Sequence, residues 1–134
     1  MRRAWMRTDG AAMIEFAFVL PFLLIIIWGI IDISRMFEAV NSLASAVREG
    51  ARAAAVVAPS DTGDVARSNI KAIVAARFAV VGGPLDTSQV QVVWNAPQDS
   101  VTANYRYQAL TPMLWAFQIS RTAAFRWEQA ATAP

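Results

Sequence analysis

A single glutamate in an apolar run is the residue of this chain that most needs a chemical partner. Glu15 lies five positions after Gly10 and is the only charged residue between Ala11 and Ile31. An unpaired carboxylate in an apolar environment is costly, so we expect a cation beside it. Cleavage after Gly10 would provide one, because it frees the amino group of Ala11, whose pKa is then about 7.7–8.0. Pairing of that cation with Glu15 of a neighbouring subunit would fix the axial register of the two helices.

Glu15 also has a simpler interpretation, in which its carboxylate lies near one end of a membrane span and snorkels toward the headgroups. Pro21 lies in the same run and removes one backbone hydrogen bond, so we expect a kink or a local loosening of the helix there. Membrane helices tolerate such a proline. We count Pro21 among the candidate positions for helix packing in an assembly.

The remaining side chains offer little for catalysis. The chain has no histidine and no cysteine, so the commonest general base, the commonest metal ligand and any thiolate are missing. Its serines have no histidine to activate them. The net charge of +2 lacks the basic footprint of a nucleic-acid-binding protein. Backbone capping explains the aspartates of the turn-like segments, which are Asp61, Asp64, Asp86 and Asp99. We expect no enzyme activity, catalytic residue, metal site, cofactor or nucleic-acid partner.

The apolar run is long enough to cross a membrane. Residues 1–10 form a short basic segment, and residues 11–31 would span about 31 Å as a helix, which matches the hydrocarbon core of a bilayer. Because the basic residues come first, the N-terminus is expected in the cytoplasm and the body of the chain across the membrane. A conventional cleaved signal peptide fits less well, since its apolar core has about 7–15 residues and an A-x-A-like site close behind it.

An amphipathic helix is predicted to continue the membrane helix over residues 32–57. Apolar residues recur there at spacings of three and four, and charged residues occupy much of the remaining surface. Gly50, Ala51 and Ala54 form a face of small residues in this stretch. Two interpretations of that face stay open. Either the backbone of another subunit approaches closely there, or the face is a packing notch against the chain's own sheet.

Residues 62–134 are predicted to hold a second helix and a small antiparallel sheet. The segment 58–64 is typical of a turn, in which Ser60, Asp61 or Thr62 caps the second helix. A Gly-Gly-Pro sequence then ends that helix. Alternation with a period of two predicts strands at residues 90–95, 101–107 and 119–127, a hairpin loop at 96–99, and a short helical turn from Thr111 to Phe117. The expected fold class is α+β, with the sheet packed on the C-terminal half of the first helix.

Several short segments of the N-terminal region form one combined pattern. They are Gly-Ala-Ala-Met-Ile-Glu-Phe-Ala at 10–17, Leu-Pro at 20–21, Asp-Ile-Ser-Arg at 32–35 and Val-Arg-Glu-Gly-Ala-Arg-Ala-Ala at 47–54. With the apolar run between them, they resemble type IV pilin-like N-termini, and more closely the TadE-like pseudopilins of the tight-adherence (Tad) pilus system. Met13 and Ile14 depart from the smaller or valine-like residues frequent before the glutamate in these families.

The resemblance implies a pilin-like fold and a processing event. A membrane prepilin peptidase would cleave between Gly10 and Ala11 and remove residues 1–10 as a leader. The mature chain would be a minor pilin or pseudopilin required to assemble a Tad pilus of the type IVb-like, Flp class, which serves surface adhesion and biofilm formation. It would sit in the bacterial inner membrane with one pass and a periplasmic C-terminal domain, or be incorporated in the pilus.

The resemblance also implies a set of partners. They are the prepilin peptidase, other pilin or pseudopilin subunits including a TadF-like protein, the inner-membrane assembly platform and the lipid bilayer. A TadE-like and a TadF-like role both stay open. The alternative hypothesis is an uncleaved, signal-anchored envelope protein whose periplasmic module binds a protein partner.

Overall fold

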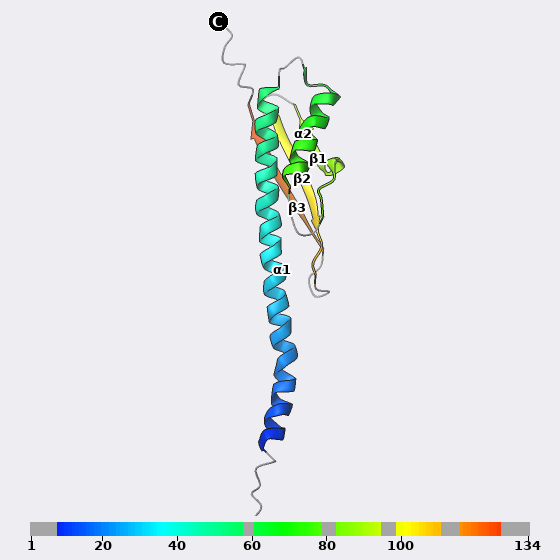
Figure 1. The fold of residues 1–134 in the computed structure, drawn as a ribbon. Helices are drawn as coiled ribbons and strands as arrows, with labels where there is room; N and C mark the ends of the chain where they lie inside the picture. Colours follow the sequence, from blue (N-terminus) through cyan, green and yellow to red (C-terminus); the bar gives the residue numbers. More distant parts are fainter. Residues whose placement is uncertain (1–7, 58–60, 79–82, 95–98, 111–115, 127–134) are drawn as a thin grey trace, which may run out of the picture.

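The computed structural model describes residues 8–57, 61–78, 83–94, 99–110 and 116–126. It contains a long helix, a second helix, a short 3-10 helix and three strands (Figure 1). In chain order these are α1 (Thr8–Val56), α2 (Asp64–Arg77), η2 (Thr87–Gln89), β1 (Val90–Val93), β2 (Asp99–Tyr107) and β3 (Phe117–Phe125). The α+β class predicted from the sequence is therefore confirmed.

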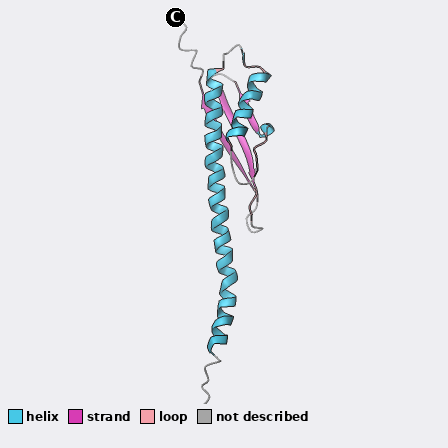
Figure 2. Ribbon diagram, viewed as in Figure 1, coloured by secondary structure: helices cyan, strands magenta, loops and turns pink. Residues whose placement is uncertain are grey.

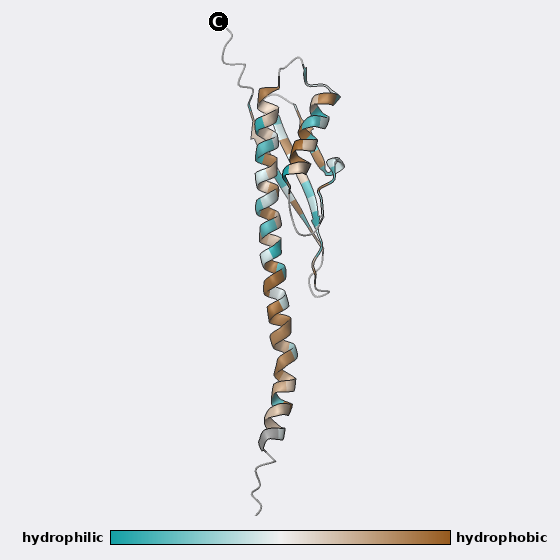
Figure 3. Cartoon of the chain, viewed as in Figure 1, coloured by the Kyte–Doolittle hydropathy of each residue, from teal (hydrophilic) through white to brown (hydrophobic). Residues whose placement is uncertain are grey.

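Helix α1 is continuous over 49 residues, which corresponds to about 70 Å at 1.5 Å per residue. Its first half projects away from the rest of the chain, and its second half packs against α2 and the sheet (Figure 1). Colouring by hydropathy separates the same two parts, because the projecting half is almost wholly apolar and the packed half is mixed (Figure 3). The helix runs through Pro21 without a break.

The three strands form one antiparallel sheet in the order β1-β2-β3. In the β2–β3 pair, Asp99 lies opposite Phe125 at one end and Tyr107 lies opposite Phe117 at the other. Helices α1 and α2 lie side by side on the same face of this sheet (Figure 2). Helix α1 contacts β2 and β3, while α2 contacts β1. The globular part is thus a two-layer domain whose helical layer includes the C-terminal half of α1.

The core lies between the two layers. On β2, side chains at alternate positions point inward, as the period of a strand requires: Val101, Ala103, Tyr105 and Tyr107 are all buried. Helix α2 contributes Ile70 and Val74. The ring of Phe78, just after α2, lies 4.7 Å from that of Tyr105 between centroids. Helix α1 contributes a buried stripe with helical spacing, made of Asp32, Ala39, Leu43, Ala46, Val47, Gly50, Ala51, Ala54 and Ala55.

Four local predictions were wrong. Helix α2 ends at Arg77 and not at the Gly-Gly-Pro sequence, and Asp99 belongs to β2 and not to the hairpin loop. The cap of α2 is Gly63, with no hydrogen bond from a capping side chain, so neither Asp61 nor Thr62 takes that role, and Ser60 lies outside the described residues. Phe117 belongs to β3 and not to a helical turn, because the strand extends far enough to pair it with Tyr107. The other residues of that predicted turn, 111–115, also lie outside the described part of the chain, as do most of the predicted hairpin loop and residue 127.

Candidate functional site

The projecting half of α1 carries the residues that the sequence singled out for processing and pairing. Gly10, Ala11 and Glu15 all lie on the helix and are exposed. Ala11 and Glu15 are four positions apart, so they share one face of the helix. A Cβ atom placed on Gly10 would meet nothing within 4 Å. The structure contains a single chain, so cleavage after Gly10 and pairing of Glu15 with a neighbour stay predictions.

The surface around Glu15 is apolar on every side. Every residue from Gly10 to Trp28 is exposed, and α1 contains the one helix segment of the described chain that is long and apolar enough to cross a membrane. None of the most apolar window of that segment is buried inside the rest of the chain's fold. A soluble monomer rarely exposes so large an apolar patch. This half of α1 therefore fits a helix that crosses a membrane once.

Asp32 directly follows the apolar run and is fully buried. The backbone N–H of Leu110 donates a hydrogen bond to its Oδ1 atom at 2.9 Å. The hydroxyl of Tyr107 donates to the backbone oxygen of Asp32 at 3.2 Å. These three residues, which we call the Asp32 junction, tie the segment after β2 to α1 at the point where the helix leaves its exposed half.

The electrostatics of the junction follow from burial. A buried carboxylate needs hydrogen-bond donors, and Leu110 supplies one from the backbone. Burial, and next the negative charge of Asp32, raise the pKa of the Tyr107 hydroxyl above its ordinary value of 10.0, while Arg35 acts in the opposite direction. The phenol therefore stays protonated and keeps donating to α1 over a wider pH range than a free tyrosine would.

A signal for Asp32 was present in the sequence. Asp32, Met36, Ala39 and Leu43 continue the spacing of four and three that defines the buried stripe of α1. Periodicity alone therefore places Asp32 on the core face. Its charge obscured this, because an aspartate directly after an apolar run resembles the polar flank of a membrane span.

The small residues of α1 lie within the subunit. A Cβ atom on Gly50 would clash with Cγ2 of Val74 in α2 and would lie 3.5 Å from Cγ1 of Val101 in β2. Ala51 and Ala54 are buried as well. The chain's own α2 and sheet therefore occupy this face. Pro21, by contrast, lies exposed in the projecting half, where packing against another subunit stays a prediction.

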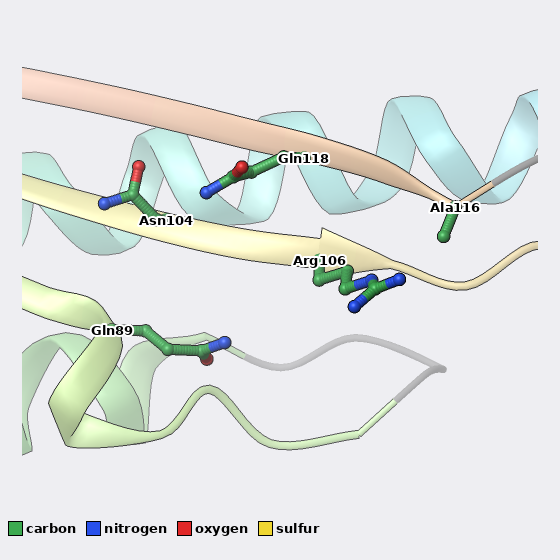
Figure 4. Close-up of a pocket in the computed structure, with 5 residues that line it drawn as sticks. All are labelled: Gln89, Asn104, Arg106, Ala116 and Gln118. Atoms are coloured by element: carbon green, nitrogen blue, oxygen red, sulfur yellow. The ribbon is translucent and has the colours of Figure 1, made fainter.

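The outer face of the sheet is polar and has one shallow hollow of about 500 Å³. Figure 4 shows the amide side chains of Asn104 and Gln118 from β2 and β3 on this face, with Arg106 nearby and Gln89 opposite them.

Among the described residues, no group of three or more acidic, histidine or cysteine side chains is placed to hold a metal ion. Asp86 caps η2 by accepting from the backbone N–H of Ser88 at 2.7 Å, and this hydrogen bond lowers the pKa of its carboxyl.

Comparison with known families bears on α1 alone. Residues 10–52 match the family model of TadE-like proteins. The match confirms the resemblance found in the sequence. No curated protein and no solved structure matches the chain. The TadE-like region, residues 10–52, contains Gly10, Glu15, Pro21, Asp32 and Gly50. It joins the exposed half of α1 to most of its packed half and ends before the sheet begins.

Proposed function

We propose that this chain is a minor pilin or pseudopilin required for the assembly of a Tad pilus. One observation carries the proposal: the TadE-like region coincides with a helix whose first half is apolar, exposed and broken only by the carboxylate of Glu15. A helix of this kind can serve the subunit both before and after assembly. It holds the subunit in the inner membrane, and it later packs among the same helices of other subunits.

Processing after Gly10 is the first step of the proposed mechanism. A prepilin peptidase removes residues 1–10, and with them the leader arginines, and leaves Ala11 with a charged amino group. In an apolar helix bundle, that amino group and Glu15 of the next subunit form an ion pair. Breaking such a pair by removing one partner costs about 3–5 kcal/mol, because it leaves the other charge buried alone. The pair therefore selects one axial register and rejects the others.

The proposed surroundings follow from the same mechanism. The N-terminus lies in the cytoplasm and the α2–sheet domain in the periplasm. The subunit contacts the peptidase, other pilin or pseudopilin subunits such as a TadF-like protein, the inner-membrane assembly platform and lipid. The chain is a substrate and a structural part in this scheme, and no step of it needs a catalytic residue.

Intact-mass measurement or N-terminal sequencing of the chain from envelope membranes tests the processing step. In cells with an active prepilin peptidase we expect a chain that begins at Ala11. The variant Gly10→Ala should stay uncleaved, and its folding should be unchanged because the added Cβ meets open space. Gly29→Ala is the matched control, since it also meets open space on α1, and it should be cleaved like the wild type. A wild-type chain beginning at Met1 or Arg2 would instead support an uncleaved anchor.

A further inference from the structure

The end of the globular domain that carries the Asp32 junction lies at the level where α1 leaves its apolar half. We propose that this end of the domain rests on the lipid bilayer, with the side chains of Leu110 and Phe117 in the headgroup layer and Asp32 as the tether. The proposal depends on insertion of residues 11–31 in a membrane, and it is independent of processing and of pilus assembly. Its partner is a phospholipid surface.

The level of the junction follows from the helix. Asp32 comes directly after the 21-residue stretch 11–31, which fills the hydrocarbon core with about 31 Å of helix. Side chains on a helix lean toward its N-terminus, so the Asp32 carboxylate is directed back toward the membrane. The backbone of Leu110 lies within hydrogen-bond distance of that carboxylate. Leu110 is therefore held at the boundary of the apolar span, although 78 positions separate it from Asp32 in the chain.

Apolar side chains are exposed at this level. Leu110 is 52% exposed and Phe117 is 43% exposed. Phe117 lies opposite Tyr107 in the sheet, and the Tyr107 hydroxyl is bonded to Asp32, so the junction holds both strand ends near α1. Exposed to water, these two side chains would gain no stabilising free energy from the burial of apolar surface. In a headgroup layer they would be covered.

The helix itself shows the features of a membrane boundary at the same place. Trp28 is exposed in the last turn of the run, and tryptophan is enriched at membrane–water interfaces. Ile33 and Phe37 stay exposed beyond Asp32, which extends the apolar surface of α1 by about one and a half turns. A headgroup layer about 5–8 Å thick would cover both side chains together with Leu110. The apolar surfaces of helix and domain therefore end at one common level.

Fluorescence quenching in reconstituted vesicles tests the proposal. The chain has no cysteine, so a single introduced cysteine can carry an environment-sensitive probe on the full chain in phosphatidylcholine vesicles. The test variant is Leu110→Cys. The matched control is Val65→Cys, which is also apolar and exposed but lies at the start of α2, at the far end of the domain (Figure 1). A Phe22→Cys probe, in the middle of the run, reports insertion of α1.

We expect lipids with a headgroup nitroxide to remove most of the fluorescence at position 110 and little at position 65. Aqueous iodide should give the reverse order. Adding Asp32→Ala to Leu110→Cys should move its quenching toward that of position 65, and Asp32→Asn, which keeps an oxygen acceptor, should not. Iodide quenching at position 110 as strong as at position 65 would overturn membrane contact, and quenching unchanged by Asp32→Ala would overturn the tether. If no lipid nitroxide quenched position 22, insertion itself would be refuted, whatever the result for processing.

Discussion

The two halves of α1 share one continuous helical backbone. They differ in burial, because the first half is exposed and the second packs against the domain. From Gly10 to Trp28 every position is exposed, and no face of the helix is reserved for the chain's own domain. From Asp32 to Ala55 a stripe of residues with helical spacing is buried against α2 and the sheet. The contrast shows that one continuous helix carries two sequence patterns, an apolar run that the domain leaves exposed and an amphipathic stretch that packs on it. The second half packs within the chain's own domain, while the first is the part that we propose contacts lipid and other subunits.

Truncating one leucine in each half of α1 should give the largest difference in the free energy of unfolding. Leu43 is fully buried, whereas Leu23 is 47% exposed. We expect Leu43→Ala to lower the free energy of unfolding of the domain by about 3–4 kcal/mol, through lost apolar contacts and a cavity. Leu23→Ala should leave it unchanged. Thermal unfolding of the full chain in detergent micelles measures both, and equal losses would contradict the division of α1.

Asp32 marks the border between the halves and should have the next largest effect. Asp32→Ala removes the acceptor of the Leu110 N–H, and we expect a loss of about 2 kcal/mol, the cost of an unsatisfied buried polar group. Asp32→Asn keeps an oxygen acceptor and should lose less. The same unfolding measurement applies. An Asp32→Ala chain as stable as the wild type would show that the hydrogen bonds to this residue do not hold the domain on α1.

Identical glycine substitutions offer a finer comparison. Replacing glycine by alanine in a helix gains up to about 1 kcal/mol from propensity alone. At Gly29 the new methyl group meets open space, and at Gly50 it clashes with Val74. We therefore expect Gly29→Ala to be neutral or slightly stabilising, and Gly50→Ala to destabilise the domain by about 1 kcal/mol after that gain is subtracted, because overpacking costs about 1–3 kcal/mol. A stabilising Gly50→Ala would contradict the close packing of α1 on α2.

Alkaline pH should lower the stability of the domain by ionising Tyr107, which donates a hydrogen bond to Asp32. Burial raises the pKa of its hydroxyl above 10.0 in the folded chain, so the folded state binds the phenolic proton more tightly than the unfolded state does. The resulting stability is complete below pH 10 and is lost as the pH rises above 10 through the raised value. Tyr107→Phe should cost about 1 kcal/mol at neutral pH, where the hydrogen bond to Asp32 is intact.

The difference between wild type and Tyr107→Phe should shrink above pH 10, since the variant has no phenol to ionise. Unfolding curves recorded at neutral pH and above pH 10 measure this. Parallel pH profiles for the two chains would show that burial and the charge of Asp32 do not raise the pKa of Tyr107.

Periodicity was sufficient to predict most of the fold. Spacings of three and four gave the packed half of α1, and alternation along 101–107 gave the inner face of β2. The sequence could not decide which surface the small residues around Gly50 contact, because close approach suits both a neighbour and the chain's own α2. The register Tyr107–Phe117 and the hydrogen bond from Leu110 to Asp32 join distant segments, so no local pattern contains them.

The candidate functional residues also fall into those that the sequence could identify and one that it did not. Gly10, Ala11 and Glu15 were found from the sequence because a charge in an apolar run is a local anomaly. Asp32 was missed as a buried residue because its charge resembles the polar flank of a membrane span, and its hydrogen bond to Leu110, 78 positions away, is visible only in the fold. The residues proposed to act between subunits thus follow from local chemistry, whereas the contact that joins distant parts of the chain needs the fold.

The effect of Glu15 on pilus formation is the most direct test of the central claim that the exposed half of α1 is an assembly helix. Glu15 is exposed and far from the domain, so its loss should leave folding and processing intact. We expect a Glu15→Ala chain to be cleaved so that it begins at Ala11, to reach the membrane at wild-type level, and to fail to support pili. Wild-type piliation with Glu15→Ala would contradict the account.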